Sequence, residues 1–194
     1  MRSENSHHPV SRIRLARQDD VVAAAVSVLD EFGFGAASVD RIAEAARTSK
    51  GNVLYHFTSK EGIYQAVVDS LYAEGGTFMT ERISEVNGFR SSLHVYLDSN
   101  LRFIAEHASH VNAVHRILEN SAGSVAGFDA VTPLRGLLAA GQEAGEFGDF
   151  DPELMALAIR AVIDGASFHF TTRPDLDVDS YIEQVVTLFS KATA

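Results

Sequence analysis

Apolar residues recur every three or four positions along most of this 194-residue chain. The first series is Val22, Val26, Leu29 and Phe32, and similar series continue to the C-terminal end. On a helix of 3.6 residues per turn, such a series forms one apolar face that must pack against another helix. No segment shows the strict alternation that is typical of a half-buried strand. The pattern therefore predicts an all-α chain of about nine helices.

Residues that commonly start or stop helices divide this pattern into separate elements. Ser38 is placed to cap a short second helix, and glycines at 33 and 35 follow the first helix. Thr58-Ser-Lys-Glu61 matches a capping box, and Asp151-Pro152 is a capping carboxylate followed by a proline. The helices expected in this way cover 19–32, a short segment after Ser38, 49–56, a segment after Thr58 that fades near Gly75–Gly76, 90–107, 111–118, a segment opened by Pro133, 152–170 and 178–191.

Composition excludes several kinds of site. The chain has no cysteine, so disulfides and thiolate metal sites are excluded. No apolar stretch approaches the roughly 18 residues that a membrane span needs, and the first twenty residues lack the apolar run of a secretory signal. We expect a soluble, cytoplasmic protein that does not enter a membrane.

The net charge of −10 is distributed unevenly along the chain. Residues 1–64 carry eight Lys+Arg against eight Asp+Glu, whereas residues 65–194 carry eight against eighteen. The stretch 47–60, RTSKGNVLYHFTSK, contains two lysines, an arginine and a histidine without one carboxylate. A surface that meets phosphates excludes carboxylates and gains from cations that release counterions. This stretch therefore suits contact with nucleic acid.

Two short helices separated by three or four residues, after a longer helix, form a helix-turn-helix pattern. In this arrangement the N-terminal part of the later helix faces base edges, where Asn52 can pair with adenine and Lys50 with guanine. Gly51 would let the backbone come close to DNA, and the remaining polar residues suit phosphate contacts. The predicted DNA-binding residues are Ser38, Arg47, Thr48, Ser49, Lys50, Gly51, Asn52, Tyr55, His56 and Lys60.

Residues 37–68, ASVDRIAEAARTSKGNVLYHFTSKEGIYQAVV, resemble the tetracycline-repressor-like (TetR/AcrR) family of bacterial transcription regulators. The resemblance rests on the short helix around Ile42, the SKGN that opens the third helix, and YHF followed by a serine, Lys60 and a glutamate. It supports the DNA-contact roles of Tyr55, His56 and Lys60. Arg47 stands where the family usually has glycine, and a left-handed conformation there costs about 1 kcal/mol. Leu54 stands where the family often has an aromatic residue.

The resemblance also implies how the chain is divided. Residues 1–18 would form a basic arm or a disordered tail, residues 19–65 the DNA-binding domain, and residues 66–194 a helical bundle for ligand binding and dimerisation. Small residues in the eighth expected helix (Ala158, Ala161, Gly165, Ala166) permit close helix approach. The last two helices, about 152–170 and 178–191, could therefore form a homodimer interface about a two-fold axis. The alternative is that both helices are buried only within their own chain.

The effector site is predicted from aromatic and polar residues that could line a cavity, although each could equally belong to the core or the surface. These ligand-binding candidates are Phe103, His107, His115, Phe128, Phe168 and His169. Four histidines between residues 94 and 115 raise the idea of a metal site, but a zinc site needs further ligands and supporting contacts. We expect no metal and no cofactor.

These features predict a ligand-responsive transcriptional regulator, a repressor that a small-molecule effector releases from a palindromic operator in double-stranded DNA. The alternative is an architectural DNA-binding protein that has no ligand. An enzyme is not expected, because the chain has no nucleophile elbow, phosphate loop or HExxH motif.

Overall fold

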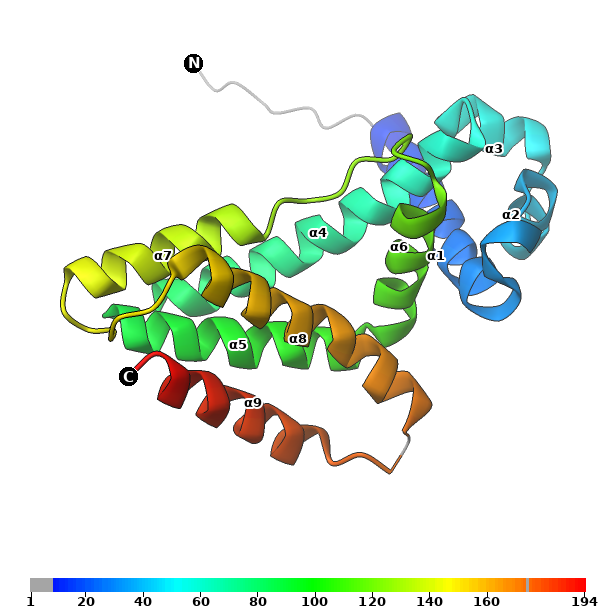
Figure 1. Ribbon diagram of the computed structural model, residues 1–194. Coiled ribbons are helices and arrows are strands. Elements are labelled where there is room, and N and C mark those ends of the chain that lie inside the picture. The colour runs from blue at the N-terminus through cyan, green and yellow to red at the C-terminus, as the bar shows by residue number, and fades with distance from the viewer. Residues whose placement is uncertain (1–8, 174) are drawn as a thin grey trace, which may run out of the picture. The chain divides into compact units, whose positions relative to one another are not determined.

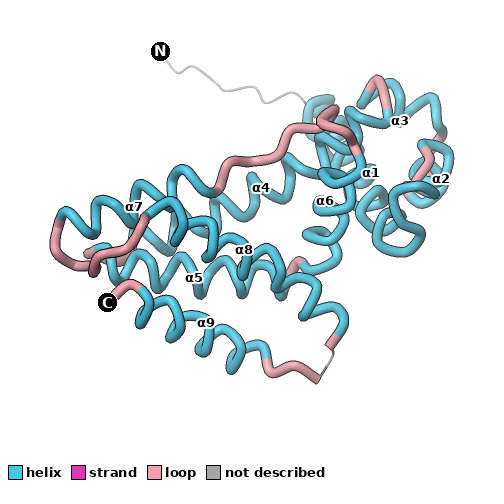
Figure 2. Tube along the Cα trace, in the orientation of Figure 1, coloured by secondary structure: helices cyan, strands magenta, loops and turns pink. Residues whose placement is uncertain are grey.

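The computed structural model describes residues 9–173 and 175–194, with side chains from residue 17 onward. Within these ranges the chain forms nine helices and no strand, which confirms the all-α prediction (Figures 1 and 2). The helices are α1 (Pro9–Ala36), α2 (Val39–Ala45), α3 (Lys50–Phe57), α4 (Lys60–Ser84), α5 (Phe89–Glu106), α6 (Ala108–Asn120), α7 (Val131–Glu143), α8 (Pro152–Thr172) and α9 (Val178–Ala192).

The chain divides into two compact units. Unit 1 contains the residues up to Asp69 together with Ala113–Ala126, and unit 2 contains Ser70–Asn112 and Gly127–Ala194. The boundary between them falls within α4 and again within α6. The sequence suggests a single division of the chain at residue 66. It does not indicate that residues 113–126 belong to unit 1.

Helix α1 differs from the expected helix at its N-terminal end. It begins at Pro9, so residues 9–18 of the predicted arm are helical, and residues 1–8 of that arm lie outside the described residues. Its regular part ends where predicted, at Gly33, which adopts φ 76° and ψ 172°. Arg116 of α6 donates to the carbonyls of Leu29 at 2.7 Å and Asp30 at 3.4 Å, which satisfies groups that a helix end leaves free.

The core of unit 1 holds the short helices in place. Ile42 of α2, Val53 of α3 and Ile63 of α4 are fully buried, as is Leu29 of α1. A helix of seven or eight residues is not stable in isolation, so α2 and α3 depend on this burial. Because Val53 is turned inward, the opposite side of α3 is left to solvent.

Helix α4 corrects two expectations from the sequence. Its cap is Ser59, whose Oγ accepts from the Gly62 amide at 3.2 Å, whereas the predicted cap, Thr58, adopts a positive φ of 65°. The helix also continues through Gly75 to Ser84 instead of fading there. A Cβ on Gly75 would lie 3.2 Å from the Phe103 ring, so this glycine lets an aromatic side chain pack against the helix backbone. That packing offsets the low helix propensity of glycine.

Unit 2 is built around α5. Helix α9 packs along α5, while α8 packs against both α5 and α7 (Figure 1). The core between them consists mainly of leucine and isoleucine, with Leu97, Leu101, Leu138, Ile159 and Ile163 fully buried. The predicted cap of α8 is confirmed, because the Asp151 carboxylate accepts from the amides of residues 153 and 154 at 2.8 and 3.2 Å.

Helix α8 also has an exposed apolar side. Contrary to the expectation from the sequence, it is long and apolar enough, by length and composition, to cross a membrane, and it is the one helix among the described residues that is. Only 28% of that apolar window is buried within the chain. Leu154, Leu157 and Phe168 are 66%, 48% and 64% exposed. One side of this helix therefore packs in the core of unit 2, and another side is exposed to solvent in the single chain.

Tyr64 links α4 to the segment between α1 and α2 and gives unit 1 a testable pH dependence. The side chain is 2% exposed, and its hydroxyl donates to the Ala37 carbonyl at 3.2 Å. Burial, assisted by the charge of Glu61, raises the pKa of Tyr64 from 10.0 to about 12. Between these values the unfolded chain loses a proton that the folded protein keeps, so folding stability falls as pH rises.

We therefore expect the free energy of unfolding of the natural protein to fall by on the order of 2 kcal/mol more than that of Tyr64→Phe over this pH window. Urea denaturation at a series of pH values from 9 to 12 measures both curves. Parallel curves would show that Tyr64 ionises normally in the folded protein.

Candidate DNA interface

The turn between α2 and α3 is formed by a residue in a left-handed conformation. Arg47 has φ 52°, and its amide donates to the Glu44 carbonyl at 3.0 Å while the Thr48 amide donates to the Ala43 carbonyl at 2.9 Å. These two bonds make a Schellman motif, which usually has glycine at the left-handed position. The left-handed conformation considered for Arg47 is therefore present, and its side chain is exposed.

The start of α3 is braced by side chains of the turn. Ser49 Oγ accepts from the Asn52 amide at 3.2 Å and so caps the helix. The Asn52 side chain donates from Nδ2 to Thr48 Oγ1 at 2.8 Å and is partly buried. In this arrangement Asn52 stabilises the turn, and contact with a base edge would require it to exchange that hydrogen bond.

Lys50 is paired with an acidic residue of α2. Its Nζ lies 2.8 Å from Asp40 Oδ2, and the two side chains are 54% and 68% exposed. An ion pair this exposed contributes only about 0–1 kcal/mol, so Lys50 can leave it readily for a stronger anion. The pair also neutralises a carboxylate close to the start of α3.

The outward face of α3 is open. Tyr55 is 73% exposed, and a Cβ on Gly51 would meet nothing closer than Ser49 Oγ at 4.0 Å. No packing within unit 1 therefore requires a glycine at position 51. The exposed Tyr55 and the open space at Gly51 leave room for a molecule to approach the backbone of α3.

Three further predicted contacts flank this face. Lys60 Nζ lies 5.2 Å from the ring centroids of both Phe34 and Tyr64, which positions its charge beside α3. Ser38 Oγ caps α2 by accepting from the Arg41 amide at 3.2 Å. His56 has a buried Nδ1 without a hydrogen-bond partner among the described residues, and its ring lies 5.3 Å from that of Tyr55. All ten predicted DNA-binding residues lie in unit 1.

The predicted ligand-binding residues belong to several elements of the chain. His107 stacks on Phe103 at 4.1 Å between ring centroids, and its Nε2 lies 3.2 Å from Glu74 Oε1. Phe128 is 61% exposed and contacts Tyr72. Phe168 and His169 are adjacent near the end of α8, and His115 belongs to unit 1.

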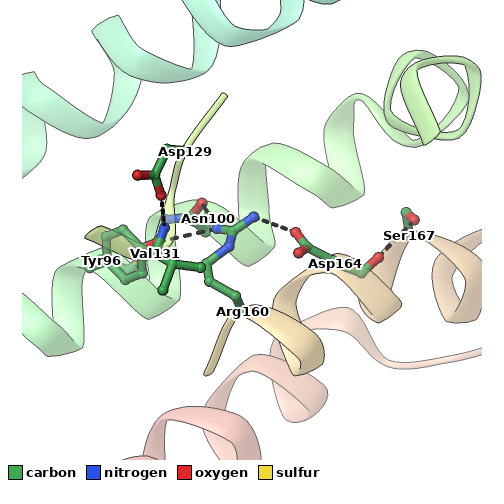
Figure 3. A network of polar contacts seen from close by, with 7 residues as sticks. All are labelled: Tyr96, Asn100, Asp129, Val131, Arg160, Asp164 and Ser167. Atoms are coloured by element: carbon green, nitrogen blue, oxygen red, sulfur yellow. Dashed lines mark hydrogen bonds and ion pairs between the residues drawn. The ribbon is translucent and has the colours of Figure 1, made fainter. Parts of the chain in front are cut away.

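Unit 2 contains a polar network that the sequence analysis missed (Figure 3). Arg160 of α8 donates from Nη1 to Tyr96 Oη at 3.2 Å and to Asn100 Oδ1 at 3.3 Å, both on α5. Its Nη2 donates to Asp164 one turn further along α8. A charged residue inside an otherwise apolar helix, paired at i and i+4, was the signal available in the sequence.

Burial alone would lower the pKa of the Arg160 guanidinium, but the Tyr96 and Asp164 oxygens outweigh burial and raise it. The arginine therefore stays charged although its side chain is only 16% exposed.

A cleft of about 430 Å³ also lies in unit 2, but no predicted ligand-binding residue lines it. Its lining residues are Val86, Arg90, Ser91, Leu93, His94, Val95, Phe147, Ser190 and Thr193. Across the described part of the chain, no three His, Asp or Glu side chains are close enough together to hold a metal ion.

Comparison with known proteins places the helix-turn-helix among bacterial regulators. Residues 21–67 match the family profile described as bacterial regulatory proteins, tetR family. The chain is 41% identical over 58 residues to the HTH-type transcriptional regulator RutR of Escherichia coli strain K12. This matched segment covers 30% of this chain and 27% of RutR. The chain thus matches only about a quarter of the length of this curated relative.

Solved structures extend the likeness to the whole fold. A tetR-family regulatory protein from Rhodococcus RHA1 covers 92% of this chain and 97% of its own, with a TM-score of 0.77 and 20% identity. AibR was solved in complex with isovaleryl coenzyme A and operator DNA. Its match covers 89% of this chain and 97% of the AibR chain, with a TM-score of 0.75 and 17% identity. At these identities the structures show a shared fold.

The turn residue provides a test that separates stability from DNA contact. Replacing Arg47 by glycine removes the strain of a left-handed arginine, so we expect Arg47→Gly to raise the free energy of unfolding by about 0.5–1 kcal/mol. The same change removes an exposed cation and should weaken binding to duplex DNA. Urea denaturation and fluorescence anisotropy measure the two effects, and Arg47→Lys, which keeps charge and strain, serves as the control. If Arg47→Gly is more stable and binds DNA as tightly as the natural protein, Arg47 does not contribute to DNA binding.

Proposed function

We propose that the chain is a homodimeric transcriptional repressor released from its operator by a small molecule, because residues 21–67 match the profile described as bacterial regulatory proteins, tetR family. The observation that carries this proposal is the open face of α3. The face holds cations and an exposed tyrosine, and the stretch from Arg47 to Lys60 contains no carboxylate. Such a surface suits the major groove, whose rims are lined by phosphates.

Within this face the residues take different roles. Lys50 and Asn52 read base edges after leaving their present partners, Asp40 and Thr48. Ser38, Arg47, Thr48, Ser49, Tyr55, His56 and Lys60 contact phosphates and set the position of α3, while Gly51 lets the backbone approach.

The dimer is proposed to form through α8 and α9. The exposed side of α8 carries large apolar residues at both ends and small residues between them: Leu154, Leu157, Ala158, Ala161, Gly165 and Phe168. Leu188 on α9 is 56% exposed. An exposed apolar stripe of this length on one helix is typical of an interface, which also accounts for a hydropathy that resembles a membrane span. Ala166, which the sequence pattern grouped with these residues, is buried within the chain.

The effector is proposed to bind in unit 2. AibR provides the precedent, since its structure contains isovaleryl coenzyme A together with operator DNA. Helices α4 and α6 each contribute residues to both units, so they connect an effector site in unit 2 to the DNA-binding unit. Binding in unit 2 would change the separation of the two α3 helices in the dimer. Loss of the contacts with one half-site would then release the operator.

An architectural DNA-binding protein is the alternative, and a DNA affinity that responds to no metabolite would favour it. Regulators of this family are not enzymes, and an operator-binding protein acts in the cytoplasm.

Selection of bound sequences from random duplex DNA, with and without a metabolite library, tests the proposed function directly. On the selected site, we expect Lys60→Met to weaken binding and to reduce the slope of log affinity against log salt by about 1. Methionine keeps the contact with the two aromatic rings while removing the charge. Asn52→Ala should instead change sequence preference with little change in the slope. An unaltered salt dependence in Lys60→Met would exclude its phosphate contact.

A charge placed on the α8 stripe tests the dimer. We expect Leu157→Glu to give a monomer in sedimentation velocity at micromolar concentration and to lower operator affinity on the order of 100-fold, because the half-sites are then bound separately. Leu157→Met keeps the stripe apolar and should behave like the natural protein. A Leu157→Glu protein that remains dimeric would place the interface elsewhere.

A further inference from the structure

Arg160 is a charged residue at a largely buried position of unit 2. It lies on α8 between the fully buried residues Ile159 and Ile163, and its own side chain is 16% exposed. Removing a guanidinium from water is costly, and apolar side chains of similar volume commonly replace buried ion pairs without loss of stability. A buried arginine at this position therefore needs another reason.

The hydrogen bonds of Arg160 leave it incompletely satisfied. Its two contacts with α5 are to neutral oxygens, at 3.2 Å to Tyr96 and 3.3 Å to Asn100. Charge-assisted bonds are usually about 2.7–2.9 Å long. Its Nε proton has no acceptor among the described side chains and carbonyls, although a guanidinium offers five donors. These bonds hold the guanidinium in a fixed direction and leave its Nε available to another acceptor.

The only carboxylate paired with Arg160 among the described residues is Asp164, whose side chain is 49% exposed. Figure 3 shows the guanidinium between the two α5 side chains and Asp164. Because the aspartate already reaches solvent, it can move away from Arg160 at little cost in burial. An entering anion would then take its place.

The surroundings suit an organic anion with an apolar body. The rings of Tyr72 and Phe128 lie 5.4 Å apart. Burial raises the pKa of Tyr72 against the lowering effect of its hydrogen bond with the Phe128 backbone, and the charges of Asp164 and Arg160 act on it in opposite directions. Unit 2 carries seven Lys+Arg against sixteen Asp+Glu, so its field repels anions and an anion site requires a local cation.

We propose that Arg160 binds the carboxylate or phosphate group of the effector, and that this group displaces Asp164 from the guanidinium. The inference rests on the proposed function, because it assigns a chemical class to the effector of that repressor. Tyr96 and Asn100 orient the guanidinium from α5, and Asp164 acts as the counter-ion of the unliganded protein.

Opposite effects of two substitutions test this exchange. Calorimetry with benzoate and with phenyl phosphate measures anion binding, the two probes distinguish the head groups, and benzyl alcohol is the uncharged control. We expect Arg160→Gln to weaken binding of the preferred anion at least about tenfold, because a bidentate charged contact is lost. Asp164→Asn removes the competing carboxylate and should strengthen binding about three- to tenfold.

Arg102→Gln is the matched control. Arg102 lies on α5 and is paired with Asp98 and Asp179, but its side chain is 39% exposed. This variant should bind the anion like the natural protein. If Arg160→Gln fails to fold, which circular dichroism shows, Arg160→Lys and Asp164→Asn decide the question. Lysine keeps the charge without the planar fork, so we expect it to bind the anion more weakly.

Three results would overturn the inference: no anion binding to the natural protein at millimolar concentration, equal binding by Arg160→Gln, or weaker binding by Asp164→Asn. A purely structural ion pair predicts the last of these. Operator binding is measured separately by anisotropy. An anion that binds through Arg160 without changing DNA affinity would support the anion site and contradict the proposed ligand response. Operator release by an uncharged metabolite alone would support the ligand response and contradict the anion site.

Discussion

The burial of Val53 is the interaction on which the DNA-contact face depends. Helix α3 has eight residues and could not persist alone in water. Val53 fixes the helix to the core of unit 1, which contains Ile42 and Ile63. Once this side is buried, the 3.6-residue period turns Tyr55 and Gly51 toward solvent. The same core holds α2, so the strained turn at Arg47 connects two helices that are already fixed in place.

The two units differ in net charge as well as in packing. Unit 1 is nearly neutral, with nine Lys+Arg against ten Asp+Glu, and three of its cations, Arg47, Lys50 and Lys60, lie in a stretch without a carboxylate. The acidic surface of unit 2 disfavours nonspecific contact with DNA, so the short cationic stretch is where a duplex can be bound. Within unit 2, Arg160 is a largely buried cation that is paired with a half-exposed carboxylate, which is why we propose it as an anion contact.

Helix α8 brings the proposed ligand contact next to the proposed dimer contact. Arg160 immediately precedes Ala161, and Asp164 immediately precedes Gly165, so each polar residue is one position from a residue of the exposed stripe. Successive residues of a helix point about 100° apart, which lets one side of α8 face α5 while the neighbouring side remains exposed. A displacement of Asp164 would therefore occur at the edge of the interface. The proposed ligand contact and the proposed dimer interface are therefore adjacent on one helix.

The sequence by itself determined the all-α class and most helix ends, and it singled out the stretch that we propose to contact DNA, because these features follow from local rules. Helical periodicity, the caps at Ser38 and Asp151, and the missing carboxylates from Arg47 to Lys60 can each be read within a few positions. The left-handed turn at Arg47 was anticipated from the family resemblance. Contacts between distant segments were not accessible in this way.

Only the tertiary structure decided that α4 continues past Gly75, where the Phe103 ring replaces the missing side chain, and that residues 113–126 return to unit 1. It also placed Arg160 beside Tyr96 and Asn100, more than 55 residues earlier in the chain. Local propensity is silent on such pairings, because packing partners are set by which faces meet when the helices assemble.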